Sequence, residues 1–268
     1  MEAGPRALLR RYSLLLAGLL LGSACKRESP GPEVDRGLEQ ALDLVASRCS
    51  VEVETAVVQC SGVEMRELAR LLVDDKQPRL DKLHTLAVSL SHSDARRRVV
   101  AANLARNVFG TSFGPEVRPG AVHAETAEAL ISGLRALPPA PAKRVAPVAA
   151  HAAMLAGRGE PLYAALQEQP NEVKLEAYRA LMTYGRLAAF SQIEPLAAGD
   201  QDQVTAALAS VAAMQKWTAA EQAEICPWLA ALTRHDNRRV VDQAFGVLSS
   251  CKAEEYQKLR TERSRRSR

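Results

Sequence analysis

From residue 35 onward, the chain alternates helix-length apolar stretches with short polar or glycine breaks. Within a stretch the apolar residues recur at spacings of three and four, a period that gathers them on one face of a helix. The series Leu38, Leu42, Val45 and Cys49 is an example. The pattern therefore predicts an all-α fold of helical hairpins, in which each helix buries one face against its neighbours.

Capping residues and glycines mark where these helices are expected to begin and end. Two pairs, Ser61 with Glu64 and Thr218 with Glu221, have the spacing of capping boxes. Further expected N-caps are Asp94, Asn171, Asp200 and Asp236. Expected helix ends lie at Gly110, Gly157, Gly185 and Gly199.

The amino-acid composition also favours an all-α fold. Alanine occupies 46 of the 268 positions, and aromatic residues make up only 4%. Alanine is the strongest helix former, whereas strands are enriched in aromatic and β-branched residues. The composition thus excludes an all-β fold, and the near balance of positive and negative charges argues against a mainly disordered chain.

A weak internal repeat runs through the body of the chain. Five segments share a polar start, then valine or a basic pair, then a central alanine and an apolar residue. Their central alanines are Ala101, Ala149, Ala177, Ala207 and Ala244. This pattern resembles the second helix of HEAT repeats, in particular the short bacterial type shared with phycobilisome lyases. Tetratricopeptide repeats have a similar period, but their aromatic and glycine signature is missing here.

The resemblance implies a right-handed α-solenoid of about five stacked antiparallel hairpins over residues 77–251, after a divergent helical cap over residues 35–76. Stacking would supply the neighbours that an alanine-rich hairpin lacks by itself. We expect the polar residues at the helix starts to have a structural role. They are Asp94, Arg98, Lys174, Asp236 and Arg239.

Residues 1–24 have the parts of an export signal. Three arginines precede an apolar run over residues 14–21, and small residues follow at positions 22–24. The sequence Leu-Leu-Gly-Ser-Ala-Cys that ends at Cys25 resembles the lipobox of bacterial lipoproteins, which implies a diacylglycerol on Cys25 as the mature N-terminus. Residues 25–34 then form a flexible tether, and Lys26 implies the outer membrane, facing the periplasm. The alternatives are an ordinary cleaved signal and export by the twin-arginine route.

The four remaining cysteines are Cys49, Cys60, Cys226 and Cys251. An even number in an exported chain without a C-x-x-C pair favours disulfides over a metal site. Because the ends of a helical array lie far apart, we expect the local pairs Cys49–Cys60 and Cys226–Cys251. Apolar spacing places each cysteine on a helical stripe, including a stripe of Val53, Val57 and Cys60. Buried free thiols are the alternative.

The positive charge is concentrated in a basic C-terminal tail. Residues 252–268 hold seven Lys and Arg against three Glu, whereas residues 25–251 carry a net charge of −2. This distribution does not indicate a nucleic-acid interface. A solvated end is the simplest interpretation of the tail, and weak contact with anionic lipid or wall polymer is the alternative.

The sequence contains no convincing catalytic or metal-binding set. Residues 110–114, Gly-Thr-Ser-Phe-Gly, match the G-x-S-x-G nucleophile elbow, with His123 as the nearest base for Ser112. That elbow requires a strand before it, and the pattern here predicts a helix. The five histidines show neither H-E-x-x-H nor a pair at i and i+4, so we expect no metal and no cofactor.

The segment from Phe109 to Val122 is an insertion between repeats, and long loops often carry function. Its candidate interaction residues are Phe109, Phe113, Val117 and Arg118. The sequence thus predicts a lipid-anchored scaffold that binds an unidentified protein partner in the cell envelope, without catalytic activity. The alternatives are an envelope protein that binds cell wall or lipid, and a hydrolase with a site near residues 109–122.

Overall fold

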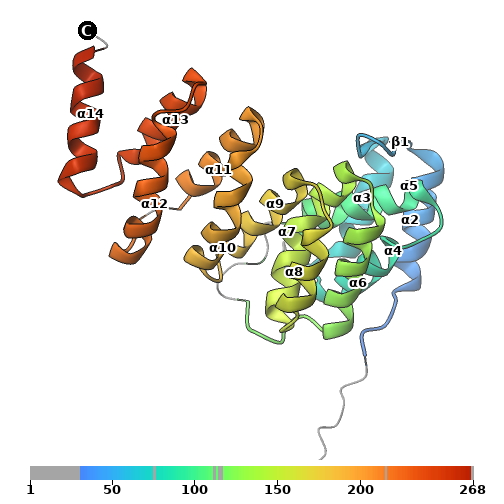
Figure 1. Cartoon of the computed structure of the whole chain (residues 1–268). Coiled ribbons are helices and arrows are strands. Elements are labelled where there is room, and N and C mark those ends of the chain that lie inside the picture. The colour runs from blue at the N-terminus through green and yellow to red at the C-terminus, as the bar shows by residue number, and fades with distance from the viewer. Residues whose placement is uncertain (1–30, 75–76, 111–112, 114–116, 215, 267–268) are drawn as a thin grey trace, which may run out of the picture. The chain divides into compact units, whose positions relative to one another are not determined.

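Helix is the dominant structure of this chain, as the apolar spacing predicts. The computed structural model describes residues 31–74, 77–110, 113, 117–214 and 216–266. From Pro32 onward the described residues form one compact unit (Figure 1). Among them, the only strands belong to two small two-stranded sheets, so the all-α prediction is confirmed at this level.

The first half of the chain carries both sheets and six of the labelled α-helices. The helices are α2 (Arg36–Arg48), α3 (Gly62–Leu72), α4 (Leu80–Ser89), α5 (Ala95–Leu104), α6 (Ala124–Ala136) and α7 (Pro139–Leu155), with the π-helix η1 (Ala105–Phe109) after α5. The strands are β1 (Ser50–Glu52), β2 (Val57–Gln59), β3 (Val73–Asp74) and β4 (Gln77–Pro78).

The second half is helical throughout its described residues. Its helices are α8 (Gly159–Gln167), α9 (Asn171–Leu181), α10 (Arg186–Ile193), α11 (Gln201–Ala212), α12 (Ala219–Leu232), α13 (Arg238–Leu248) and α14 (Glu254–Arg266), with the 3₁₀ helix η2 (Glu194–Ala198) after α10.

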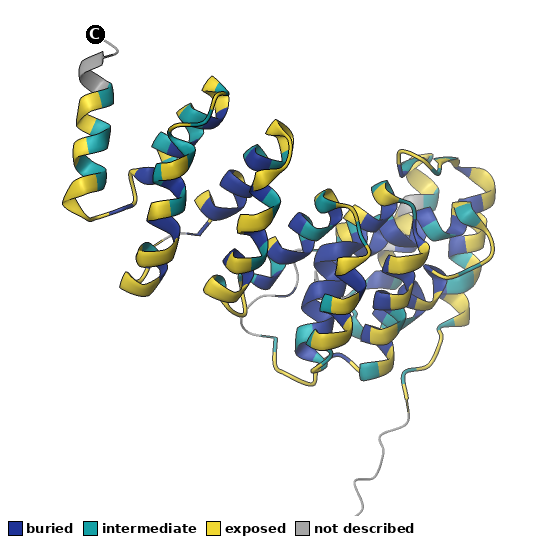
Figure 2. Ribbon diagram, viewed as in Figure 1, coloured by how far each residue is buried: buried dark blue, intermediate teal, exposed yellow. Residues whose placement is uncertain are grey.

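Alternate helices along the chain pack on one another and form a row. Helix α5 contacts α7, α7 contacts α9, α9 contacts α11, and α11 contacts α13. A second set flanks this row, since α4 contacts α6, α6 contacts α8, and α10 contacts α12. The faces that meet are buried, while the outward faces are exposed (Figure 2).

Small residues let these helices approach closely. The five central alanines of the repeat lie one each on α5, α7, α9, α11 and α13, and all are fully buried. One close approach is between the C-terminal end of α4 and α6, where a Cβ added to Gly133 would lie only 2.4 Å from the Cβ of Leu90. Any larger side chain at this crossing would force the two helices apart.

Some expected helix caps are present and others are displaced. Asp94, Asp200 and Thr218 cap their helices, and Thr218 forms the expected capping box with Glu221. At α13 the cap is Asn237 instead of Asp236, because the Asn237 side chain accepts from the amide groups of residues 239 and 240. At α9 the position belongs to Pro170, and Asn171 is the first residue inside the helix.

Residues 50–59 form a β-hairpin and not the helix expected from Val53, Val57 and Cys60. Strands β1 and β2 pair antiparallel, with Val51 opposite Val58. Valine-rich sequence favours strands, and the turn between the strands contains Ala56 at a φ of 54°. This hairpin brings Cys60 back beside the end of α2, where a disulfide joins it to Cys49.

Two hydrophobic clusters make up the core. The larger one extends from α2 to α11, and the smaller one gathers residues from α10 to α13 together with Cys251. Trp228 packs against both clusters and meets Phe190 edge to face, with ring centroids 5.5 Å apart. A disulfide between Cys226 and Cys251 joins α12 to the segment just after α13, within the smaller cluster.

The basic tail forms a helix that packs partly on α13, while most of its described residues are exposed to solvent. In α14, Arg263 forms an ion pair with Asp242 and stacks over the ring of Phe245, with its guanidinium carbon 4.2 Å from the ring centroid. Gln257 also donates a hydrogen bond to the carbonyl of Cys251 at 2.6 Å. The chain beyond residue 251 therefore covers part of α13.

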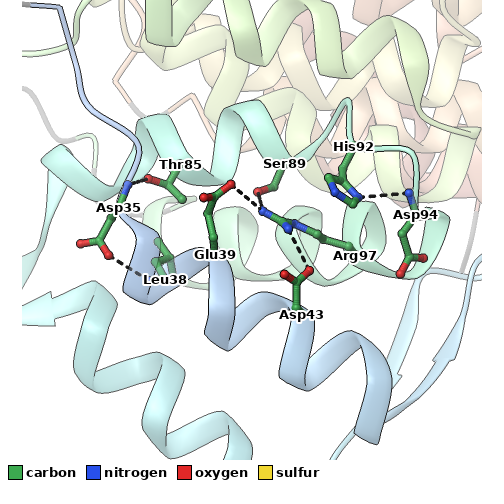
Figure 3. Close-up of polar contacts among 9 residues, drawn as sticks. All are labelled: Asp35, Leu38, Glu39, Asp43, Thr85, Ser89, His92, Asp94 and Arg97. Carbon is green, nitrogen blue, oxygen red and sulfur yellow. Dashed lines mark hydrogen bonds and ion pairs between the residues drawn. The ribbon is translucent and has the colours of Figure 1, made fainter.

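A buried arginine fixes α5 against α2 (Figure 3). The side chain of Arg97 is 6% exposed and donates hydrogen bonds to Asp43 at 2.8 Å, Glu39 at 3.0 Å and Ser89 at 3.3 Å. These acceptors come from α2 and α4, so one guanidinium group connects three helices. The two carboxylates compensate for the burial of its charge.

Candidate functional site

Three adjoining hollows form a groove across the row of helices η1, α7, α9 and α11. The first, of about 370 Å³, is lined by residues of η1, α7 and α9 together with Thr55 of the β1–β2 hairpin. The second, of about 470 Å³, extends from Lys143 to α11, and the third, of about 290 Å³, extends along α9 to His151. All three share Glu176 in their lining, so they adjoin one another, and we call them together the α7–α11 groove.

Charged side chains line the α7–α11 groove. Its cations are Arg106, Lys143, Arg144 and Arg179, and its carboxylates are Glu172, Glu176, Asp200 and Asp202. Two loose ion pairs cross from one helix to the next, Arg106–Glu176 at 3.6 Å and Lys143–Glu172 at 3.7 Å. Both pairs are partly exposed, and such pairs contribute little to stability.

Two arginines of the groove are free of such partners. Among the described residues, no hydrogen bond or ion pair involves the side chain of Arg144 or that of Arg179. Arg179 is exposed and Arg144 is half-buried. Asp202, on the α11 side, likewise has no partner in the described part of the chain. The groove thus presents unpaired cations over α7 and α9 and an unpaired carboxylate over α11.

A buried histidine lies at one end of the groove. His151, on α7, is 7% exposed, and burial lowers its pKa to about 4. Its Nδ1 lies 3.1 Å from the hydroxyl of Tyr184, whose pKa is raised by burial. On its other side His151 stacks on Phe113, with ring centroids 5.4 Å apart. His151 and Tyr184 are therefore both neutral at pH 7.

The structure shows where the candidate interaction residues of the inserted loop lie. Phe109 is fully buried and Phe113 is 5% exposed, so both aromatic rings belong to the core. Val117 is half-buried against the same core, and Arg118 is exposed. The loop is also fixed by a hydrogen bond from the amide of Gly120 to the carbonyl of Leu155, at 2.8 Å. Of the four residues, Arg118 alone is fully available to a partner.

A further cavity, of about 450 Å³, lies where the chain enters α2. Pro32, Asp35, Lys82, His123 and Thr126 are among its lining residues. Lys82 forms an ion pair with Asp35, and this contact lowers the pKa of the Asp35 carboxyl. Because the two charges satisfy each other, the cavity offers fewer free charged groups than the α7–α11 groove.

The chemical motifs of the sequence gain no support from their surroundings. The segment before the G-x-S-x-G match is helical through Phe109, and Ser112 lies outside the described residues. Among the described residues, no group of three or more His, Cys, Asp or Glu could hold a metal ion. Cys25 also lies outside that part of the chain. No helix in the described ranges has the length and apolar character needed to span a bilayer.

Sequence reasoning missed the α7–α11 groove because its residues lie far apart along the chain. Arg106, Arg144, Arg179 and Asp202 belong to four different helices, and only helix packing brings them together. A usable signal was present in the repeat itself, since each charged residue lies within a few positions of a repeat segment. No family model, curated protein or solved structure matches this chain.

Proposed function

We propose that this chain is a lipid-anchored protein-interaction scaffold of the bacterial cell envelope, and that the α7–α11 groove binds its protein partner. The proposal combines the export signal and lipobox of the sequence with the row of packed helices. The anchor is Cys25, and the compartment is the periplasmic side of the outer membrane. The groove, with its unpaired charged side chains on rigid helices, is the observation that carries the proposal.

The architecture proposed with it is a right-handed α-solenoid of HEAT-like hairpins. Support comes from the packing order, because α5, α7, α9, α11 and α13 contact one another in sequence. Support also comes from the repeat, since its central alanines are buried in these same helices. Hydrogen bonds between polar side chains also connect successive helices of the row. Asn171 of α9 bonds Gln203 of α11 at 3.0 Å, and Gln201 of α11 bonds Asn237 of α13 at 2.7 Å.

A binding role agrees better with the groove than a catalytic role does. Catalysis of acid–base type requires a group that titrates near the working pH. His151 and Tyr184 have pKa values displaced away from neutrality by burial, His151 downward and Tyr184 upward. The groove arginines, in contrast, are permanently charged and suited to recognising carboxylates.

The test is crosslinking in cells with a tagged full-length chain, followed by mass spectrometry of the crosslinked peptides. The proposal expects one dominant protein partner, with crosslinks that map to residues around the α7–α11 groove. Recovery of wall fragments or lipid alone, through the basic residues of α14, would instead support the wall- or lipid-binding alternative. Labelling of residues near Ser112 by a serine-directed activity probe would support the hydrolase alternative.

The anchor needs a separate test. Cys25→Ser should abolish labelling with radioactive palmitate and release the protein from the membrane fraction, while Ser29→Ala, in the expected tether, should leave both unchanged. Unaltered labelling and partitioning of Cys25→Ser would contradict the lipoprotein proposal and favour an ordinary cleaved signal.

A further inference from the structure

The distribution of charge in the α7–α11 groove points to one kind of partner. Over η1, α7 and α9 the groove carries the cations Arg106, Lys143, Arg144 and Arg179 against the carboxylates Glu172 and Glu176. This local excess of positive charge stands out because residues 25–251 have a net charge of −2. Clefts that concentrate one sign of charge attract groups of the opposite sign.

The arginines in the positive part of the groove have guanidinium groups that are available to bind a ligand. Arg144 and Arg179 have no hydrogen-bond or ion-pair partner among the described residues, and Arg106 reaches Glu176 only at 3.6 Å. A guanidinium group can donate two parallel hydrogen bonds to a carboxylate, so an incoming acidic side chain gains contacts that these arginines lack. Neither free arginine would have to break an existing bond first.

The opposite part of the groove, over α11, carries negative charge. Asp200 caps α11 through the amide of Gln203, and Asp202 lies exposed in the first turn. A ligand that extends past α9 therefore meets carboxylates, which repel a uniformly anionic polymer. The groove thus selects a ligand that is acidic at one end and not at the other.

We propose that the α7–α11 groove binds an extended acidic segment of a partner protein, with its carboxylates over Arg106, Arg144 and Arg179. The inference rests on the proposed scaffold function and specifies the chemistry of the partner. Packed helices lie about 8–10 Å apart, so crossing from α7 to α11 spans roughly 20 Å, which about six extended residues cover. A single phosphate group, free or in a lipid headgroup, is too small to contact all of these helices at once.

The test measures binding of immobilised peptides to the purified full chain in nonionic detergent at low salt. Three peptides of about eight residues are compared. They carry Glu, Gln or Lys at alternating positions in one half of the same Ser/Gly sequence, and the other half is uncharged. The Glu peptide should bind at least about tenfold more tightly than the Gln peptide, and the Lys peptide should bind more weakly still. Binding of the Gln or Lys peptide equal to that of the Glu peptide would overturn the proposal.

Charge-reversal variants localise the effect. The double variant Arg144→Glu with Arg179→Glu should lose at least about tenfold in affinity for the Glu peptide. Arg234→Glu is the control, because Arg234 is exposed, lies outside the groove and forms no side-chain hydrogen bond or ion pair among the described residues. An equal loss in Arg234→Glu would show a non-specific charge effect and overturn the proposal. A milder pair, Arg144→Gln with Arg179→Gln, serves if the double reversal unfolds the chain.

Two further probes separate this inference from its alternatives. Inorganic phosphate and vesicles with an anionic phosphatidylglycerol surface should compete weakly with the Glu peptide. If both bind through the same arginines while the Glu peptide does not, the groove is a phosphate surface and the inference fails. If crosslinking in cells finds a protein partner on a different face, the scaffold proposal stands and this inference alone fails.

Discussion

The guanidinium of Arg97 donates a hydrogen bond to the Asp43 carboxylate at 2.8 Å, and thereby joins α5 to α2 across 54 residues of sequence. Arg97 is almost fully buried, whereas Asp43 remains 58% exposed. Loss of the acceptors would therefore leave a buried positive charge without compensation, which is more costly than the loss of a surface ion pair.

We expect the double variant Asp43→Asn with Glu39→Gln to lower the free energy of unfolding by about 2 kcal/mol. Glu254→Gln is the control, because the pair Lys258–Glu254 is exposed on both sides. It should change stability by less than about 0.5 kcal/mol. Urea denaturation followed by circular dichroism measures both variants. Equal effects in the two would contradict a special role for the buried arginine.

The crossing of α4 and α6 gives a second prediction. Gly133→Ala places a Cβ against Leu90 and should destabilise the protein by about 1–3 kcal/mol, since the packed helices must separate. Gly246 lies exposed inside α13, and nothing lies within 4 Å of an added Cβ. Gly246→Ala should therefore stabilise the protein by up to about 1 kcal/mol. Thermal unfolding should show melting temperatures that change in opposite directions.

Each disulfide closes a local loop, of 11 residues for Cys49–Cys60 and 25 residues for Cys226–Cys251. In the chain-entropy model, loops of this size stabilise the folded state by about 3 kcal/mol each. Replacing both members of either pair by serine should lower the free energy of unfolding by that order. Peptide mapping without reduction should recover the two local pairs, and four free thiols or a bridge between the chain's ends would contradict the assignment.

The buried His151 makes stability depend on pH in a defined direction. Its pKa in the folded state is about 4, below the value of about 6.5 of a free histidine. Between these values the unfolded chain binds a proton that the folded chain excludes, so stability falls as the pH falls. At pH 5 the low pKa of His151 reduces the free energy of unfolding by about 2 kcal/mol.

We therefore expect wild-type protein to lose more stability between pH 7 and pH 5 than His151→Gln does. The charged groups that face His151 in the groove are Arg106, Glu176 and Arg179, and all three are kept in the variant. Urea denaturation at the two pH values measures the difference. The same pH dependence in both proteins would show that His151 is already protonated or solvated in the folded state.

Much of the helical framework followed from the sequence, because its signals are local. Helical periodicity and the caps at Asp94, Asp200 and Thr218 depend on residues within one or two turns. The cysteine pairs were also predictable, since each pair closes a short loop. The hairpin at residues 50–59 was not, because Val53, Val57 and Cys60, at spacings of four and three, also fit a helix. Only pairing of Val51 with Val58 distinguishes the two possibilities.

The candidate functional site could be predicted from the sequence much less well than the helical framework could. Phe109 and Phe113 stand out in an unusual loop, yet both rings are buried in the core, and that of Phe113 stacks on His151. The basic residues of the tail seemed free, yet Arg263 contacts Asp242 and Phe245 of α13. In each case a contact between distant segments decides what is exposed, and no local pattern reports such contacts.

Photocrosslinking in cells tests the central claim, that the α7–α11 groove is the surface that binds a protein partner. A photoreactive amino acid replaces Thr183 or Ala206, two exposed residues that line the groove, and separately replaces Ala231, an exposed residue of α12 outside it. The account predicts one crosslinked protein species from positions 183 and 206 and none from 231. Equal crosslinking from all three positions, or from position 231 alone, would contradict it.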